Sequence, residues 1–199
     1  MKTALFGGSF DPIHYGHLSL AESAYEKFKL DRVIFIPSGI PPHKCSTSAH
    51  KIHRLEMVKL ATRDNPYFTV SDYELKKSGK SYTYQTIEYF KQKYPGDELF
   101  FLIGIDLFLT FDTWKKSKQL LDMCKFLVGI RPGVKPLKEL RFFVRHGGLR
   151  ATKRMIIFES PLIDISSTML RKYIKEGKSV RYFLPQKVEE YMLNKGLYR

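Results

Sequence analysis

The sequence predicts an α/β protein, in which a parallel sheet carries helices on both faces and a helical appendage follows at the C-terminal end. Six short, apolar and β-rich stretches recur along the chain, and helical patterns lie between them. Strands that alternate with helices form parallel sheets with right-handed crossovers. Two further helical patterns, without another strand, occupy residues 164–199 and predict the appendage.

The expected elements follow from local patterns. The almost continuously apolar runs are typical of strands buried on both faces, and we expect them at residues 2–6, 32–37, 68–72, 99–104, 125–130 and 154–159. Segments with helical periodicity predict helices at residues 17–28, 50–63, 83–94, 116–123, 166–177 and 185–196. No repeat or linker interrupts the chain, so we expect a single domain over residues 1–199.

Composition narrows the class of protein. Hydrophobic residues make up 43% of the 199 residues, which is enough for one sizeable core. No signal-peptide pattern follows Lys2 and no apolar run has membrane-spanning length, so we expect a cytoplasmic protein without a membrane partner. Cys45 and Cys124 lack the paired spacing of a disulfide framework or a thiolate metal site, which fits a reducing compartment.

The net charge of +14 admits two kinds of partner, nucleic acid or small substrates that carry phosphates. The lysines and arginines are spread along the chain without a basic tail or an RNA-binding aromatic signature. This distribution is typical of a solvated surface. A basic nucleic-acid-binding module is kept as an alternative.

The segment GGSFDPIHYGHL, residues 7–18, follows the first expected strand and enters the first helix. Its glycines allow a ligand to approach the backbone, and a helix N-terminus offers unpaired N–H groups and positive potential. His14 and His17 can present two imidazoles to the same ligand. The segment therefore predicts a phosphate site. One alternative is that these histidines only cap the helix or pack in the core. Another is a metal site that uses this pair, or His50 and His53, but no acid or thiolate lies at the spacing needed to complete the ligand set.

Two other segments carry candidate residues. Ser166, Ser167 and Arg171 can converge on a phosphate at the start of a helix, although a capping serine with a surface arginine fits equally well. Gly104 and Asp106 follow a buried strand, where a carboxylate can accept hydrogen bonds from ribose hydroxyls or cap the next helix.

The sequence resembles a known family. Residues 8–17 match the G-x-F-x-P-x-H-x-G-H signature of the nucleotidyltransferase superfamily. The segments IPSGIPPHK, SYTYQT, FLIGIDLF, TFDTWKK, VGIRPG, DISSTMLR and YFLPQKVEEYMLNKGLY are similar, in the same order, to those of nicotinate mononucleotide adenylyltransferases. The resemblance spans the whole chain and implies a Rossmann-like fold.

The resemblance implies an enzyme that transfers the adenylyl group of ATP to nicotinate mononucleotide and releases pyrophosphate, with Mg²⁺ on the triphosphate and no metal site in the protein. It assigns catalysis to His17 and His14. It implies that ATP binds to Gly8, Ser9, Phe10, His14, His17, Gly104, Asp106, Ser166, Ser167 and Arg171. It implies that nicotinate mononucleotide binds to His43, Lys44, Thr83, Trp114 and Arg131. It implies no nucleic-acid partner and leaves open a homo-oligomer.

The residues assigned to nicotinate mononucleotide, the adenylyl acceptor, have other interpretations. The family implies that Trp114 stacks on the pyridine ring, whereas from sequence alone a partly buried surface anchor is a serious alternative. Gln85 stands where relatives often have an acid, and Ile105 where a small or polar residue is common. Another nucleotidyltransferase of the same fold, with nicotinamide mononucleotide or pantetheine phosphate as acceptor, is therefore the alternative enzyme.

Overall fold

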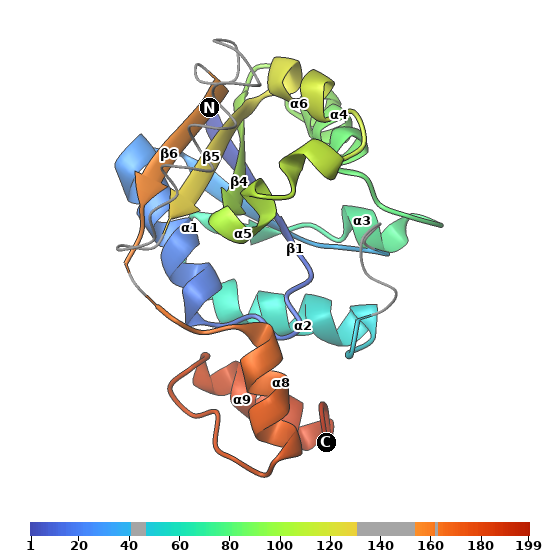
Figure 1. Ribbon diagram of the computed structural model, residues 1–199, viewed down its shortest axis with the longest axis vertical. Helices are drawn as coiled ribbons and strands as arrows, with labels where there is room; N and C mark the ends of the chain where they lie inside the picture. Colours follow the sequence, from blue (N-terminus) through green and yellow to red (C-terminus); the bar gives the residue numbers. More distant parts are fainter. Residues whose placement is uncertain (41–46, 131–153, 162) are drawn as a thin grey trace.

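The computed structural model describes residues 1–40, 47–130, 154–161 and 163–199 (Figure 1). Six parallel strands form one sheet in the order β3-β2-β1-β4-β5-β6. The strands are β1 (Lys2–Gly8), β2 (Arg32–Pro37), β3 (Phe68–Val70), β4 (Glu98–Gly104), β5 (Lys125–Ile130) and β6 (Met155–Glu159). All six predicted strands are present, and the parallel sheet is confirmed.

Each of the six predicted helices is also present. They are α1 (Tyr15–Phe28), α2 (Lys51–Thr62), α4 (Thr83–Lys93), α6 (Ser117–Met123), α8 (Ser167–Lys175) and α9 (Gln186–Asn194). The sequence patterns missed α3 (Tyr73–Lys76), α5 (Ile105–Phe108) and the 3₁₀ helix η1 (Phe111–Thr113). These elements have three or four residues, which is too short for a helical period to show.

Two apolar layers cover the two faces of the sheet. Alternate residues of β1 and β4 point to opposite faces, so Phe6 and Leu102 join one cluster while Leu5 and Phe101 join the other. Buried residues of α1, α2, α8 and α9 belong to the first cluster, and those of α4, α5 and α6 to the second. Helices therefore lie on both faces, as predicted. Figure 1 shows α8 and α9 beside α2, beyond the sheet, as the predicted C-terminal appendage.

The strand order has its reversal point between β1 and β4. The chain leaves β1 through α1 toward β2 on one side, whereas β4 lies on the other side of β1. In open α/β sheets ligands bind beyond the carboxyl ends of the strands at this point. The GGSFDPIHYGHL segment follows β1 and Gly104 ends β4, so both reach this edge. None of the helices in the described ranges is long and apolar enough to cross a bilayer.

Candidate active site

The loop from β1 to α1 is built around a glycine and a buried aromatic ring. A Cβ on Gly8 would lie 2.9 Å from the ring of Phe10, so no larger residue fits there unless the ring moves. Phe10 has a positive φ of 46° and is fully buried. Its ring packs edge-on against Phe6 and against His17, with centroid distances of 5.4 and 5.1 Å. Gly8 and Phe10 thus shape the loop and support one face of His17.

The two histidines of the motif form a stacked pair at the start of α1. His14 is the N-cap of the helix, and its ring lies 3.8 Å from that of His17, with 30° between the planes. The backbone N–H of His14 donates to Nδ1 of His17 at 3.3 Å. Because Nδ1 accepts, the neutral ring carries its proton on Nε2, which is the donor it can offer to a ligand. A Cβ on Gly16 would lie 3.0 Å from the His14 ring, so glycine here accommodates the stack.

The start of α8 is fastened to the same loop from a distant part of the chain. Ser167 Oγ donates to the carbonyl of Pro12 at 2.8 Å, and Arg171 Nη1 donates to the carbonyl of Asp11 at 2.7 Å. Ser166 is the N-cap, and its hydroxyl accepts from the backbone N–H of Met169. The structure therefore brings Ser166, Ser167 and Arg171 next to the histidine motif.

The end of β4 places the other predicted ATP contacts at this edge. Gly104 is the N-cap of α5, and Asp106 lies exposed in the first turn of that short helix. Since β4 pairs with β1, the residue after each strand opens onto the same crevice. The N-cap position of α5 is taken by Gly104, so Asp106 lies inside the first turn and not at the cap.

The predicted acceptor residues Trp114 and Thr83 lie on adjoining segments. Trp114 is the residue that follows η1; it is half-buried, with its ring 5.5 Å from that of Phe111 and edge-on to that of Phe101 at 6.3 Å. Thr83 is the first residue of α4. The next two lysines, Lys115 and Lys116, lie over the rings of Tyr82 and Tyr84 at 4.5 and 4.1 Å, which joins the two segments.

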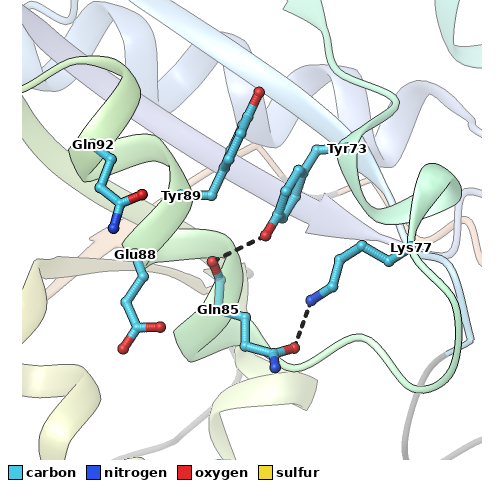
Figure 2. A pocket seen from close by; sticks show the side chains of 6 residues that line it. All are labelled: Tyr73, Lys77, Gln85, Glu88, Tyr89 and Gln92. Atoms are coloured by element: carbon cyan, nitrogen blue, oxygen red, sulfur yellow. Dashed lines mark hydrogen bonds between the residues drawn. The ribbon is translucent and has the colours of Figure 1, made fainter.

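Figure 2 shows a shallow pocket between α3 and α4, lined by Tyr73, Lys77, Gln85, Glu88, Tyr89 and Gln92. The rings of Tyr73 and Tyr89 stack at 3.8 Å, and Lys77 Nζ donates to Gln85 Oε1 at 2.5 Å. Gln85 points toward Lys77, and an acid at position 85 would meet the same lysine. Gln85, which stands where relatives often have an acid, therefore belongs to the pocket of Figure 2. None of the predicted site residues that the structure describes lines this pocket.

Sequence reasoning missed a buried arginine beneath the site. Arg54 of α2 is 1% exposed, and its guanidinium donates to the carbonyls of Ser9 and Ser38 at 2.8 and 2.7 Å. It thereby ties the loop after β1 to the loop after β2. Burial lowers the pKa of Arg54, and the neighbouring Asp11 opposes that shift. In the sequence this arginine looks like part of a solvated helix face, so no local signal identifies it.

Two buried carboxyl groups were missed as well. Asp11 is 4% exposed and accepts from the backbone N–H groups of Ser48 and Ala49 at 2.7 and 3.0 Å. Glu74 of α3 is 8% exposed and accepts from the hydroxyl of Thr86 at 2.7 Å. Burial raises the pKa of Glu74. The presence of Asp11 inside the signature was the one available hint.

The remaining candidate residues are those of two segments and the second histidine pair. His43, Lys44 and Arg131 lie outside the described residues. His50 is the N-cap of α2, and His53 Nδ1 lies 2.9 Å from the hydroxyl of Tyr191. Within the described ranges, no group of three or more His, Cys, Asp or Glu side chains is arranged to hold a metal ion.

Comparison with known proteins shows the family to which the chain is similar. Residues 5–173 match the family model described as cytidylyltransferase-like. The chain is 40% identical over 199 residues to a probable nicotinate-nucleotide adenylyltransferase of Caldicellulosiruptor saccharolyticus, covering all of both chains. It is 42% identical over 201 residues to a protein of that name from Clostridium tetani, covering 100% of this chain and 99% of the relative.

Solved structures have the same fold. A putative nicotinate-nucleotide adenylyltransferase from Vibrio parahaemolyticus matches with a TM-score of 0.68 and 25% identity, over 100% of this chain and 96% of the other. The nicotinic acid mononucleotide adenylyltransferase of Plasmodium falciparum, complexed with NaAD, matches with a TM-score of 0.81. At 19% identity, over 100% of this chain and 98% of that one, it supports the Rossmann-like fold alone.

Proposed function

The chain belongs to the nicotinate-nucleotide adenylyltransferases of the cytidylyltransferase-like family, and we propose that its stacked histidines carry the reaction of that family. The enzyme transfers the adenylyl group of ATP to nicotinate mononucleotide, giving nicotinate adenine dinucleotide and pyrophosphate, a step of NAD biosynthesis. The observation that carries the assignment of roles is the convergence of three segments at one edge of the sheet: the histidine motif, the end of β4 and the start of α8.

The chemistry requires alignment more than a protein nucleophile. A phosphate oxygen of nicotinate mononucleotide attacks the α-phosphorus of ATP, and the bond to pyrophosphate breaks. Catalysis then depends on fixing the two phosphates and on stabilising the negative charge that develops. We assign this stabilisation to His17, whose Nδ1 accepts a hydrogen bond and whose proton is therefore on Nε2, with His14 beside it on the ATP phosphates.

The ATP side extends from the histidines to α8. A guanidinium has five N–H donors, and Arg171 directs two of its nitrogens to Asp11 and Thr168, which hold it in place. We assign its remaining donors, with the hydroxyl of Ser166 and the backbone N–H of Ser167 at the start of α8, to the β- and γ-phosphates. Gly104 and Asp106, at the end of β4, are assigned to the ribose hydroxyls.

The acceptor side is assigned to Trp114 and to the start of α4. The half-exposed indole offers a face to the pyridine ring. The first N–H groups of an α-helix have no partner within the helix, and α4 begins at Thr83. These donors suit the carboxylate of nicotinate. Lys115 and Lys116, beside the start of α4, add positive potential for an anionic acceptor.

We propose Mg²⁺ as the cation that accompanies ATP. Mg²⁺ prefers oxygen ligands and is commonly held by substrate phosphates with few protein groups. The donor set of the motif suits this arrangement, because imidazole N–H and guanidinium groups bind phosphate rather than the ion. When bound, Mg²⁺ would neutralise part of the triphosphate charge.

An acceptor panel tests the function. The purified chain, with ATP and Mg²⁺, is offered nicotinate mononucleotide, nicotinamide mononucleotide or phosphopantetheine, and pyrophosphate release is measured. We expect turnover with nicotinate mononucleotide. Turnover with phosphopantetheine and with neither mononucleotide would show that the chain is another nucleotidyltransferase of the same fold. Salt-dependent binding of RNA or DNA without turnover would instead support the nucleic-acid-binding alternative.

A further inference from the structure

A tyrosine far from the motif in sequence contacts the motif loop directly. The hydroxyl of Tyr198, in the segment that follows α9, donates to Oδ1 of Asp11 at 2.7 Å. The two residues are 187 positions apart. Asp11 is almost completely buried and Tyr198 is partly buried, so this hydrogen bond is largely shielded from solvent. Figure 1 shows the C-terminus in the appendage, beside α8.

Asp11 joins several parts of the site. Its carboxylate also accepts from the backbone N–H groups of Ser48 and Ala49, just before α2. Its main-chain carbonyl accepts from Arg171 of α8. A shift of Asp11 would therefore move the anchor of the arginine assigned to the ATP phosphates. Burial beside Asp11 raises the pKa of Tyr198, so the phenol stays protonated and remains a donor.

We propose that Tyr198 is a positioning residue for the ATP-phosphate site and acts through Asp11. This inference rests on the proposed function of the motif and of Arg171. Without the phenol, the bond that Oδ1 of Asp11 keeps among the described residues is the one from Ala49. A buried carboxylate that loses a hydrogen bond is poorly solvated and shifts toward other donors or water. The carbonyl of the same residue moves with it, and Arg171 loses its fixed place.

The test replaces only the hydroxyl. In Tyr198→Phe we expect the KM for ATP to rise about tenfold, the size expected for a lost hydrogen bond to a charged group. The KM for nicotinate mononucleotide should change less than about twofold, because the two described acceptor residues, Thr83 and Trp114, make no hydrogen bond to either partner of the bond. Calorimetric titration with ATP alone should show the same loss of affinity without turnover.

Two matched variants separate positioning from general stability. Tyr191→Phe removes a hydroxyl that lies 2.9 Å from Nδ1 of His53 and also links the appendage to α2, but not to the motif. Tyr182→Phe removes a hydroxyl from a residue that is 86% exposed. Both should keep the ATP affinity of the unmodified chain. In an Asp11→Asn background, Tyr198→Phe should add little further loss, because the two residues act through one bond.

The outcomes decide between the explanations. Unchanged ATP affinity in Tyr198→Phe, whatever its melting temperature, overturns the inference. An equal loss in Tyr191→Phe does so too, since it would assign the effect to docking of the appendage. If the unmodified chain binds ATP but releases no pyrophosphate with nicotinate mononucleotide, the proposed function fails, and the ATP titrations still test Tyr198.

Discussion

Replacement of His17 by alanine tests the centre of the mechanism. In the proposed mechanism this ring directs its Nε2–H to the reacting phosphates, because Nδ1 accepts from the backbone N–H of His14. Loss of one donor at a site of developing negative charge typically costs about 2.7–4 kcal/mol. We therefore expect His17→Ala to lower kcat by about 10²- to 10³-fold, with a smaller change in the KM for ATP.

The same substitution has a structural cost that must be separated from the catalytic one. The backbone N–H of His14 loses its acceptor, and the ring of Phe10 loses its edge-on neighbour. A single lost hydrogen bond costs about 1 kcal/mol, which leaves a domain of this size folded. The assay is continuous pyrophosphate release at saturating substrates, with the melting temperature measured on the same samples.

His53→Ala is the matched control for this measurement. It removes another histidine whose ring makes a hydrogen bond, here to Tyr191, but which contacts no residue of the motif. We expect its kcat to stay within about threefold of the unmodified chain, as for a change outside the site. Near-normal turnover in folded His17→Ala, or an equal loss in His53→Ala, would refute the role assigned to His17.

Four further measurements address other parts of the site. Arg171→Ala should weaken ATP binding by about 1.5–3 kcal/mol in a calorimetric titration, and unchanged affinity would return this arginine to a purely structural role. Arg54→Met should lower the free energy of unfolding in urea by about 2–4 kcal/mol, because the carbonyls of Ser9 and Ser38 lose their buried donor. A loss under about 0.5 kcal/mol would contradict the structural role given to these two hydrogen bonds. Burial raises the pKa of Glu74 above its value in the unfolded chain, so its contribution to stability is greatest at low pH and is lost as the pH rises through the folded pKa. Glu74→Gln should therefore gain stability relative to the unmodified chain as the pH rises above about 4.5, the ordinary pKa of a glutamate, and a pH-independent difference in urea unfolding would count against this reasoning. Finally, kcat/KM should favour nicotinate over nicotinamide mononucleotide by about 10²-fold or more, since the donors at the start of α4 suit a carboxylate, and equal values would reject that assignment.

The sequence predicted the sheet well because its strands are buried on both faces. A run such as RVIFIP has few other uses in a globular protein, and β2 and β5 begin and end where they were expected. The prediction ended the first strand at residue 6, but β1 continues through Gly7 and Gly8, which pair with Ile36 and Pro37. Pairing between strands uses the backbone, so glycine does not end a strand by itself.

The site was predictable to the extent that its residues are close in sequence. GGSFDPIHYGHL brings Gly8, His14 and His17 together within one turn and the start of a helix. Asp11 and Arg54 were missed because their partners are distant or are main-chain atoms. Arg54 is 45 residues from the carbonyl of Ser9 that it binds, and no side-chain pattern marks a carbonyl as an acceptor.

The missed residues explain how a site without a covalent intermediate is held in place. A reaction that relies on alignment loses rate when its groups move by a fraction of a bond length. Loops at the end of a sheet are mobile unless they are fastened, because few of their backbone groups have partners in regular structure. Here Arg54 fixes the carbonyl of Ser9, and Asp11 holds the segment before α2 while its own carbonyl holds Arg171. Burial of these charges is costly on its own. Their placement beneath the motif is understandable if the hydrogen bonds that they give and receive keep the phosphate-binding groups in register.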